Sequence, residues 1–477
     1  MSLKKQAISG MIWTYAQQFS SQLISFGVSV VLARILLPSE FGLIGMLAVF
    51  MGLGTALFDG GLTSSLIRSN EVNEEDYSTV FYFNIAGSIV IYLLLYLVAP
   101  WIADFFHQSS LIGITRVYGL SFILSAFGAI QNTILTRELK FRQQAIITLP
   151  ALLLSSLVGL LMAFNGYGVW SLVYAALVNS LTTSCLLWVS STWRPKLIFN
   201  TKKFHEHFHY GYKLTLSAVL DIIFTNIYQL VIGRFYSPAN VGYYTRAHTL
   251  LMLPVGNVSG ALNRVVFPLF SKMQDDIPKF RDAYKKIMLM VLFIISPIVI
   301  FMAVMGRPLV IFLFTDKWLP VVPIFQIVCV TGILYPIHMY NLLVLQVKGR
   351  SDLFLKLEVI KKVLQGLILI ISFFYGFYAL LWGQLIFSCL ALLINTHYAG
   401  RMLSYSMINQ LKDIAPIFIF SIFMGLVIYY LNYLFINQPN SVQLIIGALG
   451  SGISYIFIAW LFKFQSINDI KNLIFKR

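Results

Sequence analysis

Long apolar stretches follow one another along the whole chain, separated by short segments that carry most of the charged residues. A helix needs about 20 apolar residues to cross the hydrocarbon core of a bilayer. Fourteen segments meet this requirement to within a few residues at their ends, namely 10–33, 41–63, 79–99, 111–135, 145–164, 169–189, 213–233, 243–268, 287–306, 321–345, 363–376, 377–398, 414–434 and 442–462. The eleventh and twelfth nearly abut at Gly376, which predicts a tight turn there. We therefore predict an all-α polytopic membrane protein with about 14 transmembrane helices.

Composition supports this fold class and excludes others. Of 477 residues, 58% are hydrophobic and only 11% are charged, against about 25% charged in a typical soluble protein. The net charge of +16 would suggest nucleic acid in a soluble protein, but here topology-setting loop charge is the simpler interpretation. Cys185, Cys329 and Cys389 stand singly in apolar runs without the spacing of a metal or redox motif. Lys4 and Lys5 precede a full-length span, so we expect no cleavable signal.

The positions of Lys and Arg predict the orientation. With the N-terminus placed in the cytoplasm, nearly all of these residues fall in the alternate segments that are then cytoplasmic. The opposite side receives only Arg34, Arg234, Arg307 and Lys317. Cytoplasmic loops of membrane proteins carry such an excess of positive charge. We therefore predict that both termini are cytoplasmic and that no nucleic acid is bound.

An internal repeat appears at an offset of 200 residues. The turn after the first span carries Arg34, Pro38 and Gly42, and the turn after the seventh carries Arg234, Pro238 and Gly242, both in the pattern Arg-x-x-x-Pro-x-x-x-Gly. Six spans separate the two turns, and an even number gives the two halves the same orientation. Two parallel repeats favour two lobes that rock about a site between them, although a duplicated channel or scaffold remains an alternative. We predict an N-terminal lobe at 1–200 (spans 1–6), a C-terminal lobe at 201–400 (spans 7–12), and two further spans with a basic tail at 401–477.

Polar side chains line matching faces of the first span of each repeat. They are spaced four residues apart, and their positions are Gln17, Ser21 and Ser25 in the first span and Ser217, Asp221 and Thr225 in the seventh. Residues at this spacing share one helix face. The two faces are candidates to line a common cavity, with polar packing between helices as the alternative.

Five charged residues within or at the ends of spans are candidates for function. Asp221 lies deep in its span, where a carboxylate is expensive, and is a candidate for proton or cation coupling. Asp59 is a weaker candidate, because it adjoins a Gly-Gly turn where capping explains it. Arg116 and Arg246 enter their spans from the outer side, and Arg264 lies near an inner end. Guanidinium groups suit a phosphate or diphosphate, although the first two could instead extend towards water.

Motifs for other chemistry are weak. His205, Glu206, His207 and His209 could bind a metal, but no further ligand is near in the sequence, and the segment 201–213 is typical of a basic, aromatic interfacial helix. Asp275 and Asp276 resemble the acidic pair of a glycosyltransferase only faintly. No P-loop motif is present in the sequence.

Several of these segments resemble the bacterial polysaccharide flippases. The resemblance rests on the turn at Arg34, Pro38 and Gly42, on the segments 58–67 and 267–272, and on 232–234 with 242–247. The branch most similar is the Wzx-like exporters of colanic and teichuronic acid, within the MOP transporter superfamily. The resemblance covers most of spans 1–12, and the last two spans match only in hydropathy.

The resemblance implies a V-shaped bundle of two six-helix lobes with two extra helices, located in the bacterial cytoplasmic membrane. It implies export of a polyprenyl-diphosphate-linked oligosaccharide by alternating access, with a cationic central cavity for the diphosphate. Membrane lipid and other polysaccharide assembly proteins are the implied partners, and an H⁺ or Na⁺ gradient, with no cofactor, is the implied energy source. The chain departs from this branch of flippases at one position. After the Asn of the seventh span the branch has a carboxylate, whereas here Asn226 is followed by Ile227 and Tyr228.

Three other functions compete with export. Drug or small-cation efflux on the same superfamily fold would favour a buried acidic cluster, and Asp221 stands nearly alone. A membrane polysaccharide polymerase would need a large outer loop, and the longest predicted one is only about 307–320. A scaffold without transport is the third. We predict a transporter and not an enzyme.

Overall fold

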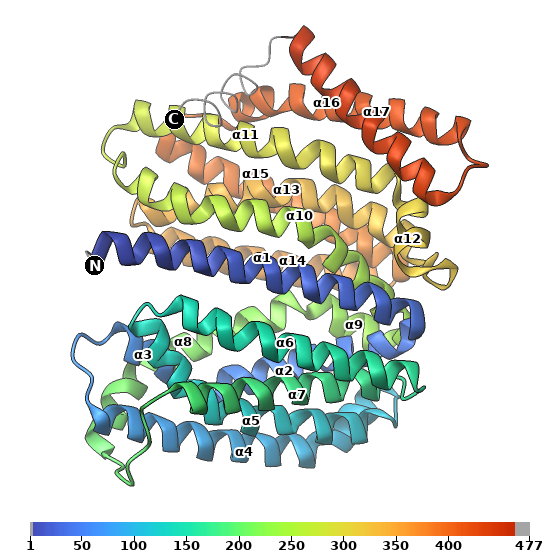
Figure 1. Ribbon diagram of the computed structural model, residues 1–477. Coiled ribbons are helices and arrows are strands. Elements are labelled where there is room, and N and C mark those ends of the chain that lie inside the picture. The colour runs from blue at the N-terminus through green and yellow to red at the C-terminus, as the bar shows by residue number, and fades with distance from the viewer. Residues whose placement is uncertain (1–2, 463–477) are drawn as a thin grey trace. The chain divides into compact units, whose positions relative to one another are not determined.

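The computed structural model describes residues 3–462, without the side chains of 3–12 and 261–265. All regular structure in this part of the chain is helical (Figure 1). Packing divides the chain into an N-terminal unit, residues 1–242, and a C-terminal unit, residues 243–477. The predicted basic tail at 463–477 lies outside the described residues.

The helices of the N-terminal unit match the first seven predicted spans. In order they are α1 (Leu3–Ile35), α2 (Pro38–Asp59), the short α3 (Leu62–Arg68), α4 (Glu74–Phe106), α5 (Leu111–Arg137), α6 (Phe141–Phe164), α7 (Trp170–Ser190), α8 (Thr201–Thr225) and α9 (Ile227–Phe235). Helix α1 packs on α6, α6 on α7, α7 on α5, and α5 on α4. Neighbours in the sequence are thus mostly neighbours in the unit, as short connections require.

Helix α10 (Pro238–Ser271) begins in the N-terminal unit and continues into the C-terminal one. The rest of the C-terminal unit consists of α11 (Ile277–Val304), α12 (Gly306–Phe314), the 3₁₀ turn η1 (Asp316–Trp318), α13 (Val321–Val347), α14 (Ser351–Phe373), α15 (Phe377–Leu403), α16 (Met407–Leu434) and α17 (Asn440–Leu461). Helix α11 packs on α13 and α16, α15 packs on α13 and α14, and α16 packs on α17.

The predicted class, a polytopic all-α membrane protein, is confirmed. Ten helices of the described residues are long and apolar enough to cross a membrane. If α8 and α9, which are bent by 48° at the break between them, are counted as one span, the number is eleven. Three further long helices, α1, α10 and α14, occupy predicted spans but do not meet that criterion. The count of fourteen therefore stays a prediction.

The backbone shows a turn between the eleventh and twelfth predicted spans and a break within the seventh. Helix α14 ends at Phe373 and α15 begins at Phe377. Gly376 has φ +95° between them, a conformation that glycine adopts without strain. The predicted turn between two spans is therefore confirmed. The seventh span is broken at Asn226, whose side-chain amide donates to the carbonyl of Ile222 at 2.8 Å.

The two Arg-x-x-x-Pro-x-x-x-Gly turns meet at their glycines. A Cβ on Gly42 would lie 1.7 Å from the carbonyl oxygen of Pro238, and a Cβ on Gly242 would lie 2.0 Å from that of Pro38. Each proline starts its helix, where its missing N–H costs nothing. The backbones of α2 and α10 can therefore touch only because both positions lack a side chain.

The sequence repeat and the packing of the helices place the seventh span in different halves of the chain. The predicted division into 1–200, 201–400 and 401–477 follows the sequence repeats and stays a prediction. The packing units divide after Gly242 instead, so α8 and α9 lie in the N-terminal unit. A close approach of backbones accompanies this placement, because a Cβ on Gly61 would lie 2.6 Å from the carbonyl oxygen of Gly211 in α8.

Gly42→Ala should destabilise the protein. The new methyl group meets backbone atoms that cannot rotate away, and overpacking typically costs about 1–3 kcal/mol. We expect a lower Tm in thermal unfolding of the purified protein in detergent. Gly27→Ala in α1 is the matched control, since a methyl group added there would point into open space with no neighbouring atom within 4 Å. Equal Tm values for the two variants would contradict the proposed backbone contact.

Candidate functional site

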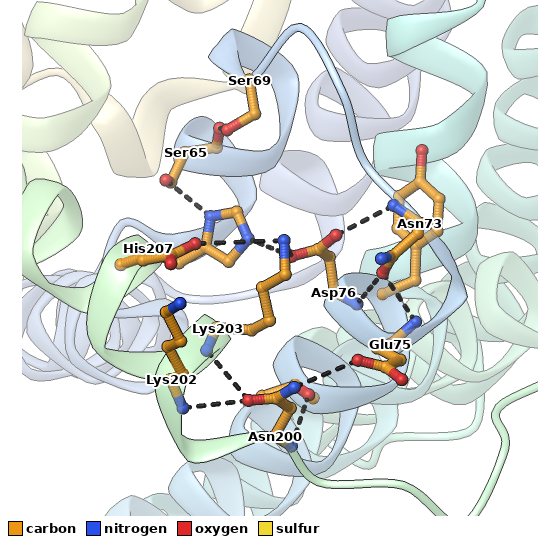
Figure 2. Close-up of polar contacts among 12 residues, drawn as sticks. Ser65, Ser69, Asn73, Glu75, Asp76, Asn200, Lys202, Lys203 and His207 are labelled. Atoms are coloured by element: carbon orange, nitrogen blue, oxygen red, sulfur yellow. Dashed lines mark hydrogen bonds and ion pairs between the residues drawn. The ribbon is translucent and has the colours of Figure 1, made fainter.

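A buried polar cluster joins three helices at one end of the N-terminal unit (Figure 2). The Ser65 hydroxyl of α3 lies 2.8 Å from Nδ1 of His207 in α8, and Nε2 of that histidine lies 3.2 Å from Oδ1 of Asp76 in α4. All three side chains are buried. Lys203 of α8 completes the cluster, with its Nζ 3.2 Å from the same Asp76 oxygen. We call Ser65, Asp76, Lys203 and His207 the α8 clamp.

The start of α4 orients the Asp76 carboxylate. Asn73 is the N-cap of this helix, and its side-chain oxygen accepts hydrogen bonds from the backbone N–H groups of Glu75 and Asp76. In return, Oδ2 of Asp76 accepts the N–H of Asn73 at 2.9 Å, which completes a capping box. One carboxylate oxygen is thus held by the backbone, and the other faces α8.

The start of α8 places the cations opposite that oxygen. Asn200 caps the helix by accepting from the N–H groups of Lys202 and Lys203. Its own side chain donates to Glu75 at 3.0 Å, so the cap is fixed on α4. Lys203 and His207 are four residues apart and therefore share one helix face. Both reach Asp76 for this reason.

The hydrogen bonds define the protonation of the cluster. An ionised carboxylate only accepts, and its three donors stabilise the charged form. Nε2 of His207 therefore carries a proton towards Asp76, and in a neutral imidazole Nδ1 then accepts from the Ser65 hydroxyl. Every polar group that faces the interior of the clamp has a partner.

The histidines of this segment do not converge on one point. His205 Nδ1 lies 2.7 Å from the carbonyl of Thr201, and both His205 and His209 are exposed, whereas His207 is buried. The residues described contain no group of three His, Cys, Asp or Glu side chains placed to hold a metal ion. The contacts of His207 are those of a structural clamp between helices.

The arginines predicted to bind substrate lie in different packing units. Arg116 in α5 is half-buried, donates from Nε to the carbonyl of Tyr96 at 3.4 Å, and lies 4.1 Å from the centre of the Tyr96 ring. Arg246 in α10 is only 7% exposed, and its guanidinium lies 5.3 Å from the ring centre of Phe314 and 5.4 Å from that of Trp318. The side chain of Arg264 lies outside the described residues.

The polar stripe of the first span borders a cavity in part. Ser25 lines a cavity of about 270 Å³ between α1, α6 and α7, together with Ser29, Ser155 and Asn179. Gln17 and Ser21 are half-buried, and the Ser21 hydroxyl oxygen is buried with no hydrogen-bond partner among the described residues. Ser25 thus fits the interpretation as cavity lining, and Ser21 fits the interpretation as packing between helices.

The two candidate ion-coupling carboxylates have different surroundings. Asp221 is exposed on α8, one turn before the break in its span. Asp59 is the last residue of α2, and its carboxylate accepts a hydrogen bond from the Thr63 hydroxyl of α3 at 3.0 Å. A carboxylate in this position satisfies the start of a helix, which fits the capping role considered from the sequence.

The arginine of the second repeat turn has a clear structural contact. Nη1 of Arg234 donates to the carbonyl of Phe105 at 2.5 Å and lies 2.7 Å from Nε2 of His107. It thereby satisfies the carbonyl end of α4, where a cation is favourable. Arg34 of the first turn is exposed.

The α8 clamp is not predicted from the sequence. The spacing of Asn73 and Asp76 before an apolar run is a recognisable capping signal. Nothing in the sequence distinguishes His207 from His205 and His209, because their environments depend on which face of α8 meets α3 and α4.

Comparison with solved structures identifies the class of fold. The structure of the lipid II flippase MurJ in an inward closed conformation superposes with a TM-score of 0.77 at 16% sequence identity, covering 96% of this chain and all of that one. The chain therefore has the fold of that flippase.

Sequence comparison then gives the family. The profile of the polysaccharide biosynthesis protein family matches residues 31–323, and the chain belongs to this family. Among its relatives is the lipopolysaccharide biosynthesis protein WzxC of Escherichia coli K12, 26% identical over 76% of this chain and 74% of that protein. The teichuronic acid biosynthesis protein TuaB of Bacillus subtilis 168 is 24% identical over 96% of each. The resemblance inferred from the turn motifs is thus confirmed.

Asp76→Asn should loosen the α8 clamp. The amide removes the charge that holds Lys203 and His207, and hydrogen bonds to charged groups contribute about 1.5–3 kcal/mol. We expect a clearly lower Tm in detergent. Glu71→Gln is the control, because it removes an exposed carboxylate from the loop just before α4 and should leave the Tm unchanged. If both variants melt together, the clamp contributes nothing to stability.

Proposed function

We propose that this protein exports a polyprenyl-diphosphate-linked oligosaccharide across the bacterial cytoplasmic membrane for surface polysaccharide biosynthesis. The observation that carries the proposal is membership of the polysaccharide biosynthesis family over residues 31–323. The relatives named for lipopolysaccharide and teichuronic acid biosynthesis support it, as does the fold shared with a lipid II flippase. On this proposal the protein transports its substrate and makes or breaks no covalent bond in it.

The transport cycle we propose is alternating access by the two parallel repeats. Such repeats favour rocking of one half against the other around a site near the middle of the membrane. The excess of Lys and Arg in alternate loops supports an orientation with both termini in the cytoplasm. The lipid-linked saccharide then enters from the inner leaflet and leaves from the outer one.

Arg246 is the cation that we propose as the main contact for the diphosphate. Its guanidinium lies against the rings of Phe314 and Trp318, and the residue is only 7% exposed. A guanidinium removed from water in this way interacts strongly with any anion that reaches it. Substrate contact therefore requires a conformation that uncovers Arg246. Arg116 and Arg264 are further proposed contacts for the head group, and Gln17, Ser21 and Ser25 are proposed contacts for sugar hydroxyls.

Ion coupling is proposed at Asp221, with Asp59 as the weaker candidate. Asp221 lies exposed on α8 within a span, where an ionised group in hydrocarbon is expensive and is usually functional. It also lies one turn before Asn226, where the span bends by 48°. Protonation or cation binding at Asp221 is thus placed to influence the bend. The driving gradient would be of H⁺ or Na⁺, and no cofactor is needed.

Arg246→Ala should slow export at least about tenfold while the protein still inserts, since charge-assisted contacts of about 1.5–3 kcal/mol are lost. The measurement is the appearance of a labelled polyprenyl-diphosphate saccharide in the opposite leaflet of reconstituted vesicles. Arg116→Ala should slow it in the same direction. Arg307→Ala, which removes an exposed arginine, is the control and should transport normally.

Two results would contradict these assignments. Normal export by both Arg116→Ala and Arg246→Ala would remove these residues from the substrate site. Protein-dependent movement of a drug cation, with no movement of the lipid-linked saccharide, would overturn the export function itself and favour efflux.

Asp221→Asn should abolish the dependence of transport on an imposed ion gradient while leaving downhill movement of the saccharide intact. The amide has the size of the carboxylate but binds neither a proton nor a cation in the physiological range. The measurement compares flipping with and without an inward H⁺ or Na⁺ gradient. Asp59→Asn serves as the comparison. A variant at position 221 that still responds fully to the gradient would exclude this site.

A further inference from the structure

A polar cavity of about 410 Å³ lies at one end of the C-terminal unit, between α11, the turn from α15 to α16, and the start of α16. Its volume is within the range of about 300–1,000 Å³ typical of small-ligand pockets. Charged side chains line it from both helices, and they are Arg281, Asp282 and Lys285 from α11 and Lys412 and Asp413 from α16. Three cations thus surround the cavity with two carboxylates.

Both carboxylates have a cationic side chain beside them. Nζ of Lys285 lies 2.8 Å from Oδ2 of Asp413, which also accepts the Tyr405 hydroxyl. Nε of Arg281 lies 3.4 Å from Oδ1 of Asp282. These pairs leave the positive charge of Lys412 in excess.

Several donors at the cavity have no protein acceptor among the described residues. The ammonium of Lys412, the side-chain amide of Asn409 and the Nη groups of Arg281 make no hydrogen bond or ion pair there. The lysine and arginine groups are charged and can only donate hydrogen bonds, and the amide nitrogen of Asn409 is an uncharged donor. The first turns of α16 contribute a further positive potential, since Met407 begins a helix of 28 residues. The surplus of donors and charge favours an anion with several oxygens.

Hydrogen bonds between buried side chains hold the turn from α15 to α16. Ser404 ends α15 with φ +52°, and the carbonyl of Tyr405 accepts the side-chain amide of Gln410 at 3.0 Å. The hydroxyl of Tyr284 in α11 lies 3.3 Å from the other end of the Gln410 amide. Tyr284, Tyr405 and Gln410 are all buried. These buried contacts fix the turn that forms one wall of the cavity, and a preorganised wall lowers the cost of binding a ligand.

An exposed apolar stripe begins at the cavity and follows α16 along its length. Ile408 and Leu411 flank Asn409 and Lys412 and are 61% and 41% exposed, and Ile419, Ile422 and Leu426 continue the stripe at intervals of about one or two turns. The helix is one of the ten long and apolar enough to span a membrane. A soluble anion would use the cavity alone, whereas a lipid would use the cavity and the stripe together.

We propose that this cavity binds the phosphate head group of an anionic membrane phospholipid, whose acyl chains lie along the apolar stripe of α16. Phosphate oxygens accept from Lys412, Arg281 and Asn409, and the ion pairs at Asp282 and Asp413 keep the carboxylates from repelling them. The site goes beyond the proposed export function and does not depend on it, because binding can be measured without transport.

The test is native mass spectrometry of the full-length protein in detergent, titrated with phosphatidylglycerol, phosphatidylethanolamine or inorganic phosphate. Lys412→Ala is the cleanest variant, since it removes a cation and breaks no ion pair. We expect phosphatidylglycerol to bind at least about tenfold more tightly than phosphatidylethanolamine, and Lys412→Ala to lose about tenfold of that affinity. Lys412→Arg should retain it. Lys356→Ala, which removes an exposed lysine of α14, is the matched control and should bind as the unmodified protein does.

Two outcomes would overturn the proposal. Equal affinity for the two phospholipids, unchanged by Lys412→Ala, would show that the cavity does not select an anionic head group. Competition by inorganic phosphate at similar concentration, with no preference for the lipid, would assign the cavity to a soluble anion. Folding is checked by the Tm, which Lys412→Ala should not alter, so a loss of affinity at constant Tm reports the cavity itself.

Discussion

The hydrocarbon interior of a membrane leaves the backbone no water to bond, and the rest of this structure follows from that constraint. Each span must satisfy its own N–H and C=O groups, which only the helix does within one segment. Interruptions are tolerated where a side chain replaces the missing partner. Arg234 does so at the carbonyl end of α4, where it donates to the carbonyl of Phe105. Asp59 and Asn226 add side-chain hydrogen bonds beside the breaks before α3 and α9.

The same constraint explains why the seventh span packs with the N-terminal unit although the repeat assigns it to the second half. Near its start at Thr201, α8 carries Lys203 and His207 on the face that packs, and polar groups buried there need partners. The capping box of α4 offers one, the oriented carboxylate of Asp76. Gly61 and Gly211 then allow the backbones to approach. The end of α8 that carries these side chains thus packs on α3 and α4 of the N-terminal unit.

The sequence predicts the features that depend on local pattern. Apolar length locates the helices, glycine locates the turn at Gly376, and the repeated motif pairs Gly42 with Gly242. It does not predict features that combine distant segments. His207 stands among similar histidines, and only the packing of α8 buries it. The rings beside Arg246 come from Phe314 and Trp318, about seventy residues later, so the sequence alone left open whether that arginine extends towards water or faces the interior. The candidate ligand contacts remain predictions for the same reason.

The contact between the two repeat turns is reciprocal: the glycine of each faces the proline carbonyl of the other. Reciprocity of this kind is the mark of an isologous two-fold interface, as found in symmetric homodimers. Two separate six-span chains could form the same contact with a single motif, each supplying one copy. If two such genes were fused, the interface would be kept, but its two sides would no longer need identical sequences. A side chain at either glycine would then require a change in the backbone of the opposite turn, so each half of the chain limits which residues the other can accept at this crossing.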